Sequence, residues 1–114
     1  MTGRRLYLAG PMTGLEDLNR PAFTHWATLM RHFGWEVTNP AELEEPKPEA
    51  TWSDWMRVCL PHVLACDVVA MLDGWEASKG ARLEYDVAKA IGTPVVRVSE
   101  LGPAYGWPPR IVCL

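Results

Sequence analysis

The chain has 114 residues, of which 48% are hydrophobic, enough to bury one core but too few for two domains of ordinary size. Its formal net charge of -3, without an extended run of lysine or arginine, excludes the electrostatic footprint of a nucleic-acid-polymer binder but allows a small phosphorylated ligand. No apolar stretch approaches the roughly 20 residues of a membrane-spanning helix, and the N-terminus lacks a signal-peptide pattern. We therefore expect one domain over residues 1–114, with no membrane partner.

The cysteines and histidines do not predict a metal or a disulfide. Cys59, Cys66 and Cys113 are odd in number and scattered, and the three histidines lie apart without a partner at useful spacing. We expect a cytoplasmic protein without a bound metal or a cofactor.

The first half of the chain alternates between strand and helix patterns. Residues 4–9 (RRLYLA) are a short apolar run before a Gly-Pro turn, which is typical of a buried strand. A helical stripe then covers residues 20–33, with Asn19 expected to cap it. Residues 35–38 (WEVT) predict a second strand, and the acidic, proline-containing stretch 42–50 predicts a surface loop.

A second helix is expected after this loop. Thr51 and Asp54 have the spacing of a capping box, with Asp in the place of the usual Glu or Gln. Pro61 inside the helix predicts a kink or a break. The positions expected to face inward are apolar: Trp55, Met56, Cys59, Leu60, Val63 and Leu64.

The remaining elements follow the same alternation. Residues 67–72 (DVVAML) read as a strand buried on both faces, and residues 94–98 (PVVRV) as the next one. A helix ending at Gly92 lies between them. The tail is irregular until residues 111–114, which are apolar enough for a fifth strand.

Glu84 stands out in this last helix. Ala81, Tyr85, Ala88 and Ile91 repeat at the spacing of an inward helix face, and Glu84 falls in the same stripe. A carboxylate facing a core costs several kcal/mol unless it is partnered, protonated or exposed in a cleft. Because the helix follows a loop at the carboxyl end of a strand, where open α/β sheets bind ligands, Glu84 is the best candidate for chemistry.

Strands and helices alternating at this spacing predict right-handed crossovers. The expected fold class is α/β: a small doubly wound, flavodoxin- or Rossmann-like parallel sheet of four to five strands with helices on both faces. In such a fold three loops, residues 10–14, 38–40 and 73–80, meet at the carboxyl ends of the strands. Their small and hydroxylated residues suit an anion, yet no GxGxxG and no lysine-bearing phosphate loop is present, and turn chemistry alone explains the glycines about as well.

Several other residues have two readings. Asp67 can cap a neighbouring backbone group, Tyr7 can be a core aromatic, and Ser78, six residues before Glu84, can cap the last helix. The tryptophans Trp52, Trp55 and Trp107 suit core or interface packing, or ligand stacking.

Together these motifs resemble the nucleoside 2-deoxyribosyltransferase superfamily, and most closely its small phage and bacterial branch of the DUF4406 type. The resemblance is carried by residues 7–14 (YLAGPMTG), the pair Cys66-Asp67, and residues 74–84 (GWEASKGARLE), and it covers residues 7–96. It implies a single nucleoside 2-deoxyribosyltransferase-like domain, no cofactor, and a homo-oligomer, dimeric or higher.

The resemblance also implies roles for individual residues. In the family, the glutamate at the position of Glu84 attacks the anomeric carbon of a 2-deoxyribosyl N-glycoside, and the glycosyl-enzyme passes the sugar to another base or to water. Tyr7 would orient this glutamate, and Asp67 would contact sugar or base and assist proton transfer to the leaving base. The implied substrate-binding residues are Gly10, Pro11, Met12, Thr13, Gly14, Gly74, Trp75, Ser78 and Gly80.

Ser78 departs from the transferases that use free nucleosides, which carry an aspartate at this position to hold the 5′-hydroxyl. A serine here is similar to the 2′-deoxynucleoside 5′-monophosphate N-glycosidases. Without that carboxylate, a 5′-phosphate escapes a like-charge repulsion of roughly 1 to 4 kcal/mol at about 4 Å.

The sequence thus predicts an enzyme, an N-glycosidase that cleaves the N-glycosidic bond of a (deoxy)nucleoside 5′-monophosphate through a glutamate nucleophile. Two alternatives remain: a nucleoside 2-deoxyribosyltransferase that exchanges bases, and a non-catalytic nucleotide-binding or sensing module. The expected partners are a small nucleotide or nucleoside and other copies of the chain. The base, the sugar and the number of subunits stay open.

Overall fold

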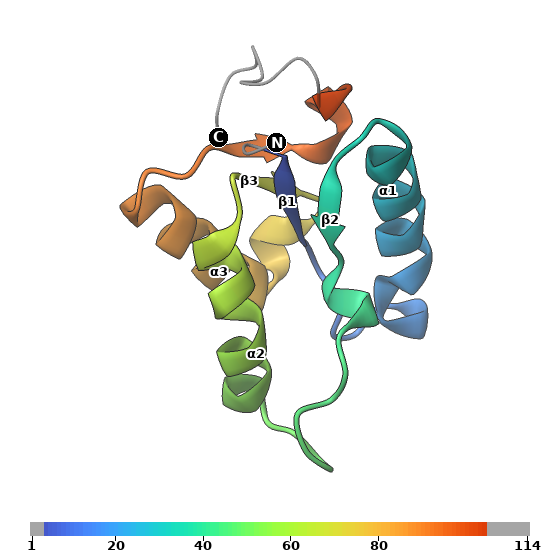
Figure 1. Ribbon diagram of the computed structural model, residues 1–114. Coiled ribbons are helices and arrows are strands. Elements are labelled where there is room, and N and C mark those ends of the chain that lie inside the picture. The colour runs from blue at the N-terminus through green and yellow to red at the C-terminus, as the bar shows by residue number, and fades with distance from the viewer. Residues whose placement is uncertain (1–3, 105–114) are drawn as a thin grey trace.

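Four parallel strands form one sheet in the computed structural model, which describes residues 4–104 (Figure 1). They are β1 (Arg5–Ala9), β2 (Glu36–Thr38), β3 (Val68–Met71) and β4 (Val95–Arg97), in the order β2-β1-β3-β4. This confirms the predicted α/β fold with a parallel sheet. The fifth strand predicted at residues 111–114 lies outside the described residues.

The strand order places a topological switch point between β1 and β3. After β1 the chain moves outward to β2, and it then returns to the other side of β1 to form β3. Leu6 pairs with Val37 on one side and with Val68 on the other, so β1 is a central strand. The loops that follow β1 and β3 diverge at such a point and leave room for a ligand.

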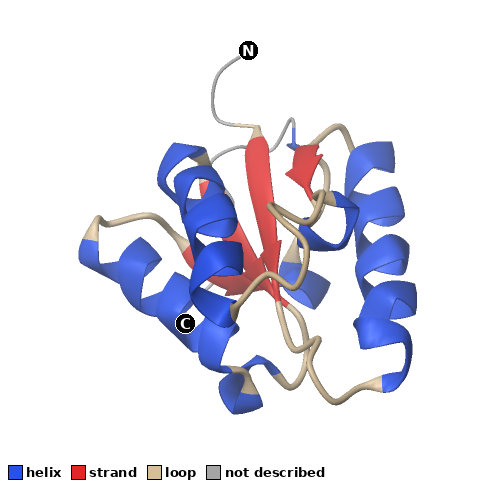
Figure 2. Ribbon diagram, turned by 90° about the horizontal axis from the view of Figure 1, so that it is seen from below, coloured by secondary structure: helices blue, strands red, loops and turns tan. Residues whose placement is uncertain are grey.

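Helices cover both faces of the sheet, as Figures 1 and 2 show. Helix α1 (Arg20–His32) lies on one face, and α2 (Trp52–Ala65) and α3 (Lys79–Ala90) pack together on the other. Single turns of 3₁₀ helix lie at Pro40–Glu42, Trp75–Ala77 and Val98–Glu100, and a turn with left-handed residues at Glu16–Asn19 precedes α1. Among residues 4–104, no helix is long and apolar enough to cross a membrane.

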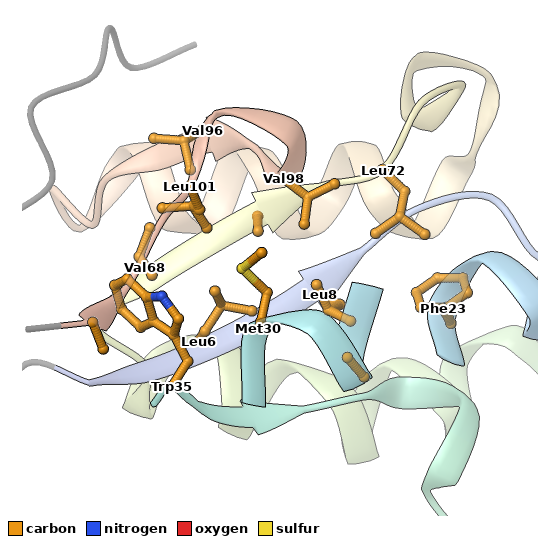
Figure 3. Close-up of a cluster of buried hydrophobic side chains, with 13 residues drawn as sticks. Leu6, Leu8, Phe23, Met30, Trp35, Val68, Leu72, Val96, Val98 and Leu101 are labelled. Carbon is orange, nitrogen blue, oxygen red and sulfur yellow. The ribbon is translucent and has the colours of Figure 1, made fainter. Parts of the chain in front are cut away.

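The pleat of β1 divides the core into two layers. Successive strand residues point to opposite faces. Leu6 and Leu8 join the cluster under α1, which also contains Phe23, Met30 and Trp35 (Figure 3). Tyr7 and Ala9 point the other way and join the cluster under α2 and α3, with Met56, Cys59, Val63, Ala81 and Ala88. The alternation of β1 therefore directs the Tyr7 side chain toward α3.

The helix ends differ in how well the sequence predicted them. The capping box of α2 is confirmed: the Asp54 N–H donates to the Thr51 hydroxyl, and the Asp54 carboxylate accepts from the Thr51 N–H. The predicted cap at Asn19 is wrong, because its backbone is left-handed and its side chain makes no capping bond. The Asn19 amide donates instead to the Pro11 carbonyl at 2.9 Å, which ties the loop after β1 to the start of α1.

Three local expectations need correction. Helix α2 continues through Pro61 without a break, because the proline lies on its exposed side near the last turn. Leu64 and Ile91 were expected to face the core, but their side chains are largely exposed. Both lie in the last turn of a helix or just after it, where the chain turns away from the sheet.

Gly10 lies where the loop after β1 passes closest to the chain leaving β3. A Cβ atom at Gly10 would lie 2.8 Å from the Leu72 Cβ, a contact that only a backbone shift relieves. The Gly10→Ala variant should therefore lose about 1–3 kcal/mol of unfolding free energy, measured by chemical denaturation. Gly102→Ala is the matched control, because a Cβ there meets nothing within 4 Å and both variants stiffen the unfolded chain equally. Equal stability of the two variants would contradict the close approach.

Candidate functional site

Glu84 is a buried carboxylate with one partner, the hydroxyl of Tyr7. Its residue is only 5% exposed, on the face of α3 that also buries Ala81 and Ala88. The Tyr7 hydroxyl reaches it from β1 and donates a hydrogen bond to Oε2. The Ser78 hydroxyl accepts from the Ala81 N–H at 3.2 Å, and this cap starts α3 so that Glu84 falls one and a half turns later. The site thus joins the central strand to the helix after β3.

Burial tunes the acidity of this pair. Loss of solvent raises the pKa of Glu84 from 4.5 to about 7, and the hydrogen bond from Tyr7 opposes that rise. Burial, followed by the charge of Glu84, raises the pKa of Tyr7 well above its ordinary value, so the phenol keeps its proton and remains a donor. The Cys59 thiol beside them has a pKa raised by burial and by the Glu84 charge. At neutral pH, Glu84 therefore exists in both protonated and ionised forms.

A pocket of about 610 Å³ opens beside this pair, within the range of about 300–1,000 Å³ that small-molecule sites occupy. Four segments line it: the loop after β1, the segment after β2, the first half of α2 and the start of α3. Seven of the lining residues are among those that the sequence predicts as catalytic or substrate-binding: Tyr7, Gly10, Met12, Thr13, Ser78, Gly80 and Glu84. The loops at the carboxyl ends of the strands converge here, as expected for the fold.

Four residues expected to bind substrate do not line the pocket. Gly74 takes a left-handed turn against Pro11, and Gly14 also has a positive φ, so these glycines shape the two loops. Pro11 offers its carbonyl to Asn19, and Trp75 stacks on Tyr85 with their ring centroids 4.8 Å apart. These four residues therefore support the loops that line the pocket but do not line it themselves.

Asp67 does not fit the role at the leaving base that the resemblance implied. It precedes β3, at the amino edge of the sheet, whereas Glu84 lies on the return helix α3 and contacts Tyr7 in the middle of β1. The Asp67 carboxylate accepts a hydrogen bond from the Arg5 N–H at 2.9 Å. It caps the amino end of β1, which is the structural reading that the sequence left open, and it does not line the pocket.

Several lining residues were missed as site residues. Arg20 begins α1 and lines the pocket near Thr13, although its side chain also reaches Asp17 at 3.4 Å. Before it, Asp17, Leu18 and Asn19 all have positive φ, a conformation that costs non-glycine residues free energy and is typical of functional loops. Cys59 was read as a core position of α2. A single buried cysteine gives no signal in the sequence that it borders a carboxylate.

Two tryptophans of α2 lie at the pocket rather than in the core. Trp52 and Trp55 both line it, and the Lys79 ammonium lies 3.9 Å from the centre of the Trp52 ring. Ligand stacking on these side chains stays a prediction. Trp107 lies outside the described residues, and assembly into an oligomer stays a prediction.

A second pocket of about 470 Å³ lies at the amino ends of β1 and β2. Its charged groups are satisfied by exposed ion pairs: Arg31 binds Glu42 with one contact of 2.6 Å, and Arg5 lies 3.8 Å from Glu36. Its Cys66 thiol is kept neutral, because burial and the Asp67 charge raise the pKa to about 11. None of the residues lining this pocket is a buried carboxylate. The Glu84 pocket is therefore the candidate site.

The donor set does not suggest a metal. Within the part of the chain that the structure describes, no group of three or more His, Cys, Asp and Glu side chains is placed to hold a metal ion.

Comparison with known families gives one match that covers most of the chain. Residues 4–97 match the family described as a domain of unknown function, DUF4406. A comparison with curated proteins gave no significant match.

The pKa of Glu84 predicts how stability depends on pH. The folded protein holds this proton more tightly than the unfolded chain, so the carboxyl stabilises the fold fully below pH 4.5 and loses that contribution as the pH rises toward about 7. Relative to Glu84→Gln, the wild type should lose about 3 kcal/mol over this window, measured as unfolding free energy by denaturant titration at each pH. Tyr7→Phe should move the window upward, because it removes the bond that favours the ionised form. Parallel curves for wild type and Glu84→Gln would show that Glu84 titrates normally.

Proposed function

The chain belongs to the DUF4406 family, and we propose that it is an N-glycosidase acting on a nucleoside 5′-monophosphate, with Glu84 as the nucleophile. The observation that carries the proposal is the buried Glu84 carboxylate, held by the Tyr7 hydroxyl at the wall of a pocket of nucleotide size.

Glu84 has the properties that attack on an anomeric carbon requires. A carboxylate nucleophile beside an oxocarbenium-like transition state must be oriented and poorly solvated. The Tyr7 hydroxyl fixes one oxygen of Glu84, and burial removes most of its water. A pKa of about 7 leaves a substantial ionised fraction at neutral pH, so no separate base is required to activate it.

The start of α3 and the loop after β1 support binding of a phosphate. Ser78 and Gly80 lie at the first turn of α3, whose free N–H groups and helix dipole favour an anion. Thr13 and Arg20 line the same pocket and add a hydroxyl and a guanidinium. None of these four residues carries a negative charge. A 5′-phosphate held here would leave the sugar between the phosphate and Glu84.

The reaction then proceeds in two steps. The Glu84 carboxylate forms a bond to C1′ of the sugar while the bond from C1′ to the base nitrogen breaks, and the bonding electrons leave with the base. Water next attacks C1′, loses one proton and releases the carboxylate. A base that leaves from an uncharged nucleoside takes up one proton, which balances the proton lost by the water. Tyr7 acts on Glu84 by orientation throughout, because its raised pKa keeps the proton on the phenol. A second base in place of water would make the protein a 2-deoxyribosyltransferase.

Replacement of Glu84 by Gln should abolish the reaction while preserving the shape of the site. Free base released from a panel of ribo- and deoxynucleoside 5′-monophosphates is measured by chromatography. We expect the rate of release by Glu84→Gln to be at least about 1,000-fold lower than that of the wild type. Glu76→Gln is the matched control, since Glu76 is exposed in the loop before α3, and it should retain activity.

The same assay separates the alternatives. A new nucleoside formed when a second base is present would identify a transferase. Equal release by wild type and Glu84→Gln would exclude Glu84 as the nucleophile. Saturable nucleotide binding without release of base would identify a binding or sensing module.

Replacement of Ser78 by Asp tests the phosphate. Aspartate caps a helix as well as serine does, so α3 should fold, but its charge repels an adjacent phosphate by roughly 1 to 4 kcal/mol at about 4 Å. The ratio of kcat/KM for a nucleoside 5′-monophosphate to that for the free nucleoside should fall at least about 10-fold. Ser99→Asp, at an exposed serine after β4, is the control for added charge. An unchanged ratio in Ser78→Asp would place the phosphate elsewhere.

A further inference from the structure

We propose that the nucleotide cleaved at this site carries a positively charged base, such as a pyridinium or an N-alkylated purinium. This inference rests on the proposed function and names the class of its substrate. It follows from the proton donors, the charges and the aromatic side chains of the pocket.

The first observation concerns the proton that a neutral base needs in order to leave. Within residues 4–104, the titratable side chains that line the pocket are Tyr7, Arg20, Glu45, Cys59 and Glu84. Glu84 serves as nucleophile, and an arginine does not give up its proton. Burial and the Glu84 charge raise the pKa of both Tyr7 and Cys59, which makes them weaker acids than in water.

Glu45 does not replace the missing acid. It lies on the exposed loop before α2, open to solvent, whereas a carboxyl that acts as general acid is kept protonated by an apolar surrounding. Asp67, the acid that the family resemblance implied, does not line the pocket, and its carboxylate accepts a hydrogen bond from the Arg5 N–H. The described pocket therefore contains a nucleophile without a matched general acid. General acid catalysis typically contributes about 10²–10⁴-fold in rate.

A cationic base removes the need for this acid. When the C1′–N bond breaks, its electron pair neutralises the positive charge of the ring, and the base leaves as a stable neutral molecule. Water then adds to C1′, its oxygen forms the new hydroxyl of the sugar, and its second proton goes to solvent. The balance is one nucleotide and one water consumed, with one neutral base, one sugar phosphate and one proton released.

The second observation is that the pocket suits a cation. Within the described residues Glu84 has no ion-pair partner, so a positive ring beside it would supply the missing countercharge and favour the ionised carboxylate. The indole of Trp55 lines the pocket, and aromatic faces attract cations. Trp52 shows the same preference within the protein, since it holds the Lys79 ammonium over its ring.

The test uses pairs of substrates that differ in charge but little in shape. One pair is nicotinamide mononucleotide and its reduced, uncharged dihydropyridine form; the other is 7-methylguanosine 5′-monophosphate and guanosine 5′-monophosphate, each also with 2′-deoxyribose. Base release by the wild-type protein is measured as kcat/KM and divided by the uncatalysed rate constant at the same pH. This division removes the greater intrinsic lability of the cationic members. The two pairs distinguish a pyridinium from a purinium substrate.

We expect the corrected rate to be at least about 100-fold greater for the cationic member of one pair, with one proton released per turnover. In the Glu84→Gln background, the Kd of that cation should be about 10-fold lower than that of its neutral counterpart. Trp55→Leu should reduce this preference and Trp55→Phe should keep it, which separates an aromatic contribution from simple packing.

The outcomes separate the two proposals. Corrected rates that are equal within a pair, or greater for the neutral member, overturn the cationic substrate and leave the glycosidase standing. Release from neither member of any pair, in either sugar form, overturns the cationic substrate, even where the cation binds more tightly. The glycosidase is overturned as well only if the panel of nucleoside 5′-monophosphates also yields no free base.

Discussion

The hydrogen bond between Tyr7 and Glu84 is the contact on which the site depends. It links the central strand to the helix that returns after β3, and it lies in the layer between sheet and helices. Burial of a carboxylate without a partner costs several kcal/mol, and one hydroxyl offsets only part of that cost. The part of this desolvation cost that remains is seen in the Glu84 pKa, which is raised to about 7. The fold therefore keeps a poorly solvated carboxyl group at the wall of the pocket.

The loops around this pair show the same compromise between stability and function. At Gly10 the chain passes so close to Leu72 that a methyl group does not fit, and the turn before α1 holds three successive non-glycine residues at positive φ. Each such residue costs free energy that the surrounding structure must supply. The amide of Asn19, bonded to the Pro11 carbonyl, helps to hold this geometry. The strain is concentrated on the loop that brings Thr13 and Arg20 to the pocket.

Most of the fold could be predicted from the sequence because it rests on local patterns. Buried strands are short apolar runs, and the capping box at Thr51 is a pattern of two residues. Glu84 could be singled out because a carboxylate in an apolar stripe violates the pattern. Tyr7 was indicated only by the family resemblance, because its pattern alone is that of a core aromatic. Cys59 and Arg20 could not, because their importance depends on which elements the topology brings together. The helix cap expected at Asn19 does not form for a related reason, because the Asn19 side chain donates a hydrogen bond to the Pro11 carbonyl instead.

Asp67 shows how the direction of the strands decides chemistry. Asp67 and Glu84 flank the same strand in sequence, yet parallel strands put all their amino ends on one edge of the sheet and their carboxyl ends on the other. The Asp67 carboxylate accepts a hydrogen bond from the Arg5 N–H at the amino end of β1, and Asp67 does not line the pocket that contains Glu84. The aspartate therefore stabilises the amino end of β1, and the glutamate is the one buried carboxylate that the described pocket contains. For the glycosidase that we propose, such a site would have to obtain the leaving-group proton from elsewhere or act on a base that needs none. Under that proposal, the charge of the leaving base, in addition to its shape, determines which substrates the pocket cleaves.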